Sequence, residues 1–139
     1  MNTTTPYVGK YLRSVGLKVT RDGDLYYAGL AQERDLVVRW KRGVLTIAVA
    51  MPVEAEEMDA AAAVAKATLI GTAGTKIYFV SEAEEPDMWF KLETGCRTRA
   101  QFEEMFTSNF EKVFQTVRKY LSLRYEVKKV MSSETQAGA

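Results

Sequence analysis

The segment LIGTAGTKIYFV, residues 69–80, carries the pattern in this sequence that most resembles a phosphate-binding loop. Gly71, Gly74 and Lys76 could form a shortened glycine-rich cradle that ends in lysine. A phosphate loop, however, runs from a strand through G-x-x-x-x-G-K-[ST] into a helix, whose N–H groups meet the phosphate. Here the predicted order is helix, loop and strand, and the glycines are spaced too closely. We therefore interpret Gly71 as the cap of a helix and Gly74 as a turn into a strand, and we expect no nucleotide and no other cofactor.

Cys96 is the only cysteine of the chain, which contains no histidine. Without histidine, Ser-His-Asp and Cys-His catalysis are excluded and the commonest transition-metal ligand is missing, so we expect no metal site. Cys96 lies next to Arg97 and just before a predicted helix, and both features can lower the pKa of a thiol. A redox role is one interpretation of Cys96. An incidental cysteine is the favoured one, since the chain offers neither a resolving thiol nor a histidine base.

Acidic residues are concentrated in the middle of the chain. Residues 54–93 hold nine acidic and three basic side chains, a net charge of −6, whereas residues 94–133 hold four acidic and eight basic ones, a net charge of +4. Glu54, Glu56, Glu57 and Asp59 fall in the first turns of a predicted helix, where the helix dipole favours negative charge. Their spacing does not match a calcium loop, and the clusters are predicted at exposed element ends rather than in a cleft. We therefore expect no enzymatic activity.

The elements that must position these residues follow from hydrophobic periodicity. Helices are predicted over 6–17, 53–70 and 98–126, and strands over 24–30, 35–40, 44–51, 74–82 and 87–95. Hairpins without a βαβ period indicate one antiparallel sheet with helices packed on it. The predicted fold is thus an α+β domain with a five-stranded sheet in the order α-β-β-β-α-β-β-α. Residues 1–127 are predicted to form a single domain, and residues 128–139 a polar, disordered tail.

The hairpin around Arg42-Gly43 allows the faces of the sheet to be assigned. A two-residue turn there places Trp40 opposite Leu45 and gathers the apolar side chains on one face. A four-residue loop over 31–34 then puts Tyr26 on the opposite, outer face. The residues of this outer face that we predict to contact a partner are Tyr26, Val37, Arg39, Val44, Tyr78 and Trp89. An alternative left open is that another segment of the chain covers this face.

The last predicted helix carries the strongest signals. Thr98 and Gln101 have the spacing of a capping box. From Phe102 to Leu121 the apolar residues recur at helical spacing and form one broad stripe, which is typical of a core-facing helix. The stripe is therefore interpreted as core rather than as a ligand site.

In the order of its elements the chain resembles the type III secretion chaperones and the YbjN family of proposed bacterial sensory transduction regulators. The resemblance covers residues 6–125. It rests on YVGKYLRSVGL, on the strands DLYYAGL, DLVVRW and VLTIAVAMPV, on the middle helix leading into GTKIYFV, and on MWFKLET followed by TRAQFEEMFTSNFEKVF. Because secretion chaperones of this fold tend to be acidic and this chain has a net charge of +1, the YbjN group is favoured.

The resemblance implies a non-enzymatic, dimeric, protein-binding regulator or chaperone. We accordingly expect a protein partner or a second copy of the chain. The alternative is a small-ligand or single-stranded nucleic-acid-binding domain that uses the same sheet face. The near-neutral charge makes nucleic acid the less favoured partner. A single cysteine fits a reducing compartment, and no apolar run is long enough for a signal core or a membrane span, so a cytoplasmic location is expected.

Overall fold

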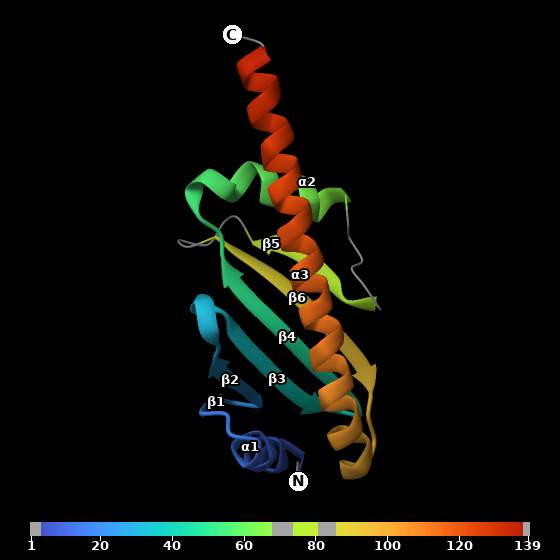
Figure 1. Ribbon diagram of the computed structural model, residues 1–139. Coiled ribbons are helices and arrows are strands. Elements are labelled where there is room, and N and C mark those ends of the chain that lie inside the picture. The colour runs from blue at the N-terminus through green and yellow to red at the C-terminus, as the bar shows by residue number, and fades with distance from the viewer. Residues whose placement is uncertain (1–3, 68–73, 81–85, 138–139) are drawn as a thin grey trace.

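A computed structural model of the chain describes residues 4–67, 74–80 and 86–137 (Figure 1). These residues form three helices, six strands and two short 3-10 turns. In chain order the elements are α1 (Thr4–Ser14), β1 (Val19–Asp22), β2 (Leu25–Gly29), η1 (Ala31–Glu33), β3 (Asp35–Lys41), β4 (Val44–Pro52), η2 (Ala55–Glu57), α2 (Met58–Ala67), β5 (Lys76–Val80), β6 (Asp87–Gly95) and α3 (Arg99–Ala137).

The strands form one antiparallel sheet in the order β1-β2-β3-β4-β6-β5. The prediction of a mixed α+β fold with an antiparallel sheet is confirmed. The predicted strand count of five and the predicted element order are wrong, because β1 was missed. This edge strand, of sequence VTRD, has a single apolar residue, Val19, and so lacks the alternation that identifies a half-buried strand. It pairs with β2 across a tight turn in which Gly23 has a φ of 63°.

The hairpin between β3 and β4 has the predicted register. Trp40 lies opposite Leu45 and Lys41 opposite Val44. The two turn residues, Arg42 and Gly43, have φ angles of 53° and 74°. Positive φ at both positions is the turn geometry whose twist matches that of the flanking strands. One face of the two strands, which we call the inner face, therefore holds Leu36, Val38, Trp40, Leu45, Ile47 and Val49.

Tyr26 was predicted on the opposite, outer face, and this is wrong. Tyr26 pairs with Val38 and is only 3% exposed, so it belongs to the inner face. The pairing of Gly29 with Asp35 leaves five residues in the connecting loop instead of four, because Leu30 joins it. Because side chains alternate along a strand, this slip of one residue moves the whole of β2 to the other face.

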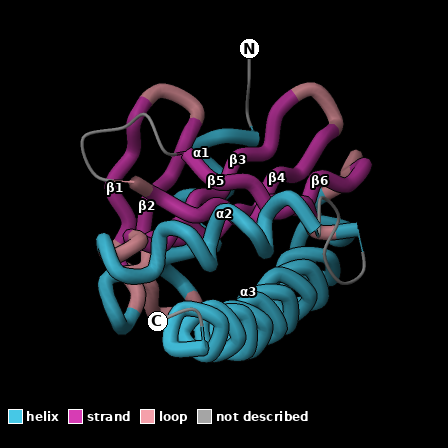
Figure 2. The backbone as a smooth tube through the Cα atoms, turned by 90° about the horizontal axis from the view of Figure 1, so that it is seen from above, coloured by secondary structure: helices cyan, strands magenta, loops and turns pink. Residues whose placement is uncertain are grey.

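The core lies between the inner face and the helices. Figure 2 shows α2 and α3 on one side of the sheet. At the lower end of the sheet in Figure 1, α1 packs beside the start of α3. There the ring of Phe102 stacks on Trp40 with centroids 5.2 Å apart, and Tyr11 meets Phe102 edge-on at the same distance. The largest fully buried side chains are Tyr120, Phe90, Phe102, Leu12, Leu36, Leu45, Ile47 and Met88.

Helix α3 begins where its cap was predicted. The Thr98 hydroxyl accepts a hydrogen bond from the Gln101 N–H at 3.1 Å, and the Gln101 side chain accepts one from the Arg97 N–H at 2.8 Å. The helix then continues to Ala137. Residues 128–137, which we predicted to lie in a disordered tail, are therefore helical.

Candidate functional site

The outer face carries the other five residues that we predicted to bind a partner. The rings of Tyr78 and Trp89 lie parallel with centroids 6.3 Å apart, and the Lys91 ammonium lies 5.6 Å from the Tyr78 centroid. Val44 and Tyr78 are 38% and 37% exposed, whereas Val37 is 6% exposed. Val37, Arg39, Val44, Tyr78 and Trp89 thus share a face, but only part of it offers apolar surface. Partner binding by these five residues remains a prediction.

The structure also places the residues that suggested nucleotide or thiol chemistry. Gly74 has a φ of 85° before β5, and Lys76 is an exposed residue of that strand, whereas Gly71 lies outside the described residues. Cys96 is 1% exposed, and its thiol lies 3.7 Å from the Thr98 carbonyl oxygen. Burial raises the pKa of Cys96, contrary to the lowering that its position before a helix suggested. A buried thiol with a raised pKa is a poor nucleophile.

A surface that the sequence analysis did not predict lies on the second half of α3. The helix has 39 residues, which at 1.5 Å each makes it about 58 Å long, whereas the nine residues of β6 span about 30 Å. Figure 1 shows the red end of α3 projecting past α2 and the sheet. Val130 is 56% and Met131 36% exposed there.

The exposed residues of this projection continue the core stripe of the helix. Leu123, Val127, Val130 and Met131 fall within about 100° of one another around α3. Leu123 and Val127 are half-buried against the core, and the next two residues lie beyond it. We call these four residues the stripe end.

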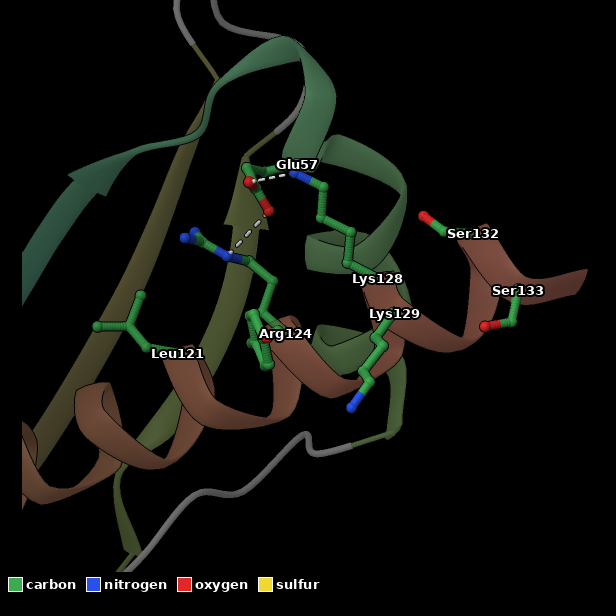
Figure 3. A pocket seen from close by; sticks show the side chains of 8 residues that line it. Glu57, Leu121, Arg124, Lys128, Lys129, Ser132 and Ser133 are labelled. Carbon is green, nitrogen blue, oxygen red and sulfur yellow. Dashed lines mark hydrogen bonds and ion pairs between the residues drawn. The ribbon is translucent and has the colours of Figure 1, made fainter. Parts of the chain in front are cut away.

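A hollow of about 440 Å³ lies on another flank of α3 (Figure 3). Its walls come from η2 and from the last turns of α3. We call it the α3 hollow, and its lining residues are Glu57, Leu121, Arg124, Tyr125, Lys128, Lys129, Ser132 and Ser133. Tyr125 is 66% exposed and lies about 140° around the helix from Val130, whereas Arg124 lies about 20° from Met131, so the hollow faces another side of α3 than Val130 and adjoins the stripe end at Met131.

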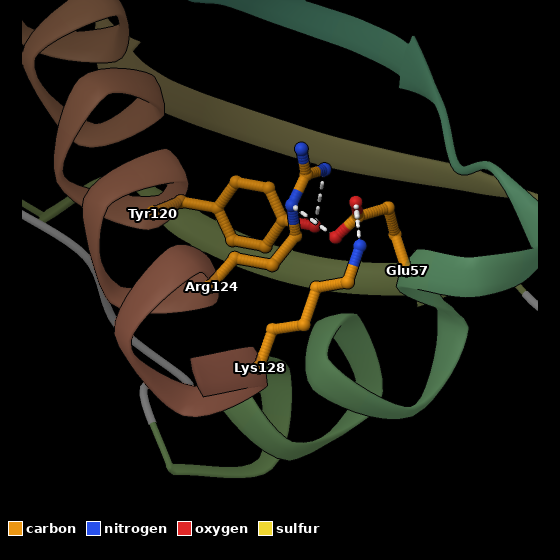
Figure 4. Close-up of polar contacts among 4 residues, drawn as sticks. All are labelled: Glu57, Tyr120, Arg124 and Lys128. Atoms are coloured by element: carbon orange, nitrogen blue, oxygen red, sulfur yellow. Dashed lines mark hydrogen bonds and ion pairs between the residues drawn. The ribbon is translucent and has the colours of Figure 1, made fainter. Parts of the chain in front are cut away.

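Two cations of the α3 hollow hold the Glu57 carboxylate (Figure 4). The Lys128 ammonium donates to Glu57 Oε1 at 2.7 Å, and Arg124 Nε lies 3.4 Å from Oε2. Arg124 also donates to the Tyr120 hydroxyl at 3.4 Å. Burial raises the pKa of Tyr120, and this hydrogen bond opposes the rise. Arg124 and Glu57 are each 19% exposed, so the ion pair is half-buried and joins η2 to α3.

The third cation of the hollow, Lys129, does not form an ion pair with Glu57. Lys129 extends away from Glu57 in Figure 3, and the ion pairs found among the described residues do not include it. Three cations and one carboxylate give the lining a net charge of +2. The hollow can therefore attract a further anionic group, while Leu121 and Tyr125 offer apolar contact beside it.

One signal in the sequence pointed toward this arrangement. The segment that contains Glu57 has a net charge of −6, and the segment that contains Arg124 and Lys128 has a net charge of +4. Segments of opposite charge attract, but net charge does not say which residues meet. Glu57 and Lys128 are 71 positions apart, and only the packing of α2 on α3 brings them together.

The fold is similar to that of a solved structure. YbjN of Escherichia coli, described as a proposed transcription regulator, superimposes with a TM-score of 0.56; the match covers 88% of this chain and 92% of that one. The two sequences are 10% identical, so the likeness shows the fold alone. It supports the YbjN-like fold predicted from the order of elements. No protein-family profile and no curated protein sequence matches the chain.

Two further findings concern the described part of the chain. None of its helices has both the length and the apolar character that crossing a membrane requires. In the same residues, Cys, Asp and Glu side chains do not gather into a group of three or more that could hold a metal ion.

Proposed function

We propose that the chain is a non-enzymatic regulatory domain that works by binding protein, and that it forms a homodimer through the stripe end of α3. The observation that carries the proposal is the apolar stripe of α3, which continues beyond the sheet and α2 to residues that are more than one third exposed. A helix segment that lacks tertiary packing is only marginally stable in water. Contact with another polypeptide would both bury this stripe and stabilise the projection.

A second copy is the simplest occupant of the stripe end. In a two-fold dimer the same patch is used by both copies, so each apolar contact counts twice. Val130 retains about half of its surface in solvent, and burying that half contributes about 1 kcal/mol per copy. The pair of valines therefore contributes about 2 kcal/mol, or about 30-fold in the dissociation constant.

Sedimentation velocity across a concentration series tests the dimer. We expect the wild-type chain to sediment as a dimer, and Val130→Lys to weaken association by at least the factor given above, because the ammonium cannot be buried unpaired. Ser122→Lys is the matched control: it adds the same charge to an exposed position on another side of α3 and leaves association unchanged. A wild-type monomer at all concentrations, or equal association of both variants, would refute the proposed dimer.

A further inference from the structure

We propose that the α3 hollow binds an acidic segment of a partner protein, one that presents carboxylates next to an apolar side chain. This inference rests on the proposed protein-binding function and names the chemistry of the partner. The hollow opens on the side of α3 that carries Tyr125 and Lys129, about 140° and 100° around the helix from Val130, so a dimer formed through Val130 can carry two such hollows.

The hollow already shows that it can hold a carboxylate. Glu57 enters from η2, and its two oxygens are held by Lys128 at 2.7 Å and by Arg124 at 3.4 Å. Hydrogen bonds between a cation and a carboxylate are among the stronger ones in proteins. An incoming carboxylate would meet the same kind of donors.

Glu57 does not saturate the site. After it neutralises one cation, the lining keeps a net charge of +2, and Lys129 extends away from Glu57 into open surface. The hydroxyls of Ser132 and Ser133 lie on the same wall and can donate to an anion. The remaining donors are thus arranged for at least one more carboxylate.

The lining favours a peptide over a nucleic acid. Leu121 is half-buried and Tyr125 largely exposed, which provides an apolar contact beside the cations. A volume of about 440 Å³ accommodates a few side chains. The Glu57 carboxylate in the middle of the site would repel the closely spaced phosphates of a nucleic acid, whereas a peptide can place its carboxylates around it.

Fluorescence anisotropy with the full chain tests the inference. The probe is a fluorescein-labelled peptide of repeated Glu-Glu-Leu units, and its control has Gln in place of Glu. We expect salt-sensitive binding of the acidic peptide only. Lys129→Gln should weaken binding about fivefold, as expected for the loss of one exposed charge pair. Glu57→Gln should tighten it about fivefold, because both clamped cations become available.

Lys10→Gln is the matched control, since it removes one exposed positive charge from α1, far along the chain from the hollow. It should leave peptide affinity unchanged. Lys129→Gln disturbs none of the ion pairs found in the described residues and so keeps the test valid if Glu57→Gln loosens η2. Equal affinities for wild type, Lys129→Gln and Glu57→Gln would overturn the inference.

Two further outcomes would assign the hollow to another ligand. An oligothymidylate that displaces the peptide and loses affinity in Lys129→Gln would make nucleic acid the ligand class. A dimer that dissociates in Lys129→Gln would make a second copy the occupant. Val130→Lys separates the two proposals: if it abolishes the dimer while peptide affinity stays, both proposals stand. If the peptide fails to bind while the dimer still depends on Val130, only the hollow inference fails.

Discussion

Replacing Gly9 of α1 by alanine tests the position of Tyr26 in the core. A Cβ atom at Gly9 would lie 2.6 Å from Cε1, Cζ and Oη of Tyr26, closer than van der Waals contact allows. Tyr26 is 3% exposed, so its ring has little room to move away. Helix α1 can thus pack closely on β2 because Gly9 has no side chain.

Whether Gly9→Ala stabilises or destabilises the protein depends on the contact between position 9 and Tyr26. Alanine in a helix interior is favoured over glycine by about 1 kcal/mol. Overpacking a well-filled core costs about 1–3 kcal/mol. We therefore expect Gly9→Ala to lower the free energy of unfolding by about 1 kcal/mol in net terms. If Tyr26 lay on the outer face, as its sequence context suggested, the same substitution would stabilise the protein.

Urea unfolding followed by tryptophan fluorescence measures the effect, because Trp40 is buried beside α1. In a Tyr26→Val background the obstructing ring is gone, and Gly9→Ala should become stabilising; the coupling energy between the two sites should be about 2 kcal/mol. Gly29→Ala is the control glycine, since its Cβ would meet no atom within 4 Å. A higher urea midpoint for Gly9→Ala in the wild-type background would refute the packing described for α1.

Three other substitutions probe the cap, the turn and the aromatic cluster. Thr98→Ala removes the cap of α3 and should cost about 1 kcal/mol in the free energy of unfolding by urea titration. Arg42→Gly relieves a left-handed residue with a φ of 53° and should raise the free energy of unfolding, measured by urea titration, by about 0.5–1 kcal/mol. Burial, and then a hydrogen bond to Glu103, raise the pKa of Tyr7 from 10.0 to about 12. The folded state thus binds the Tyr7 proton more strongly than the unfolded state does. In urea titrations, the difference in the free energy of unfolding between wild type and Tyr7→Phe should be constant below about pH 10 and should fall toward pH 12.

Local signals made parts of the fold predictable from the sequence. The register of β3 and β4 followed from a two-residue turn and an unbroken alternation, because a slipped register would have exposed a row of apolar side chains. The start of α3 followed from Thr98 and Gln101, whose side chains satisfy N–H groups at the helix terminus. In both places the relevant interactions are made within a few residues of chain.

Features decided by contacts between distant segments escaped prediction. The face of Tyr26 depends on whether Leu30 belongs to the strand or to the loop. The loop contains η1, in which Gln32 and Glu33 have positive φ angles that their residue types do not predict. The continuation of α3 through residues 128–137 was obscured by its polar composition. The α3 hollow needs Glu57 and Lys128 to meet, and no local pattern encodes that pairing.

The ion pairs that Arg124 and Lys128 form with Glu57 fix the orientation of the projecting end of α3. A helix that served only to cover the sheet could end soon after Tyr120, the last fully buried residue of its stripe. Arg124 and Lys128 lie past that point and bind η2, so the turns that carry them are held against the body of the protein. Val130 and Met131 of the stripe end follow Lys128 within one turn and are thereby presented in a fixed orientation, which lowers the entropy cost of binding a partner.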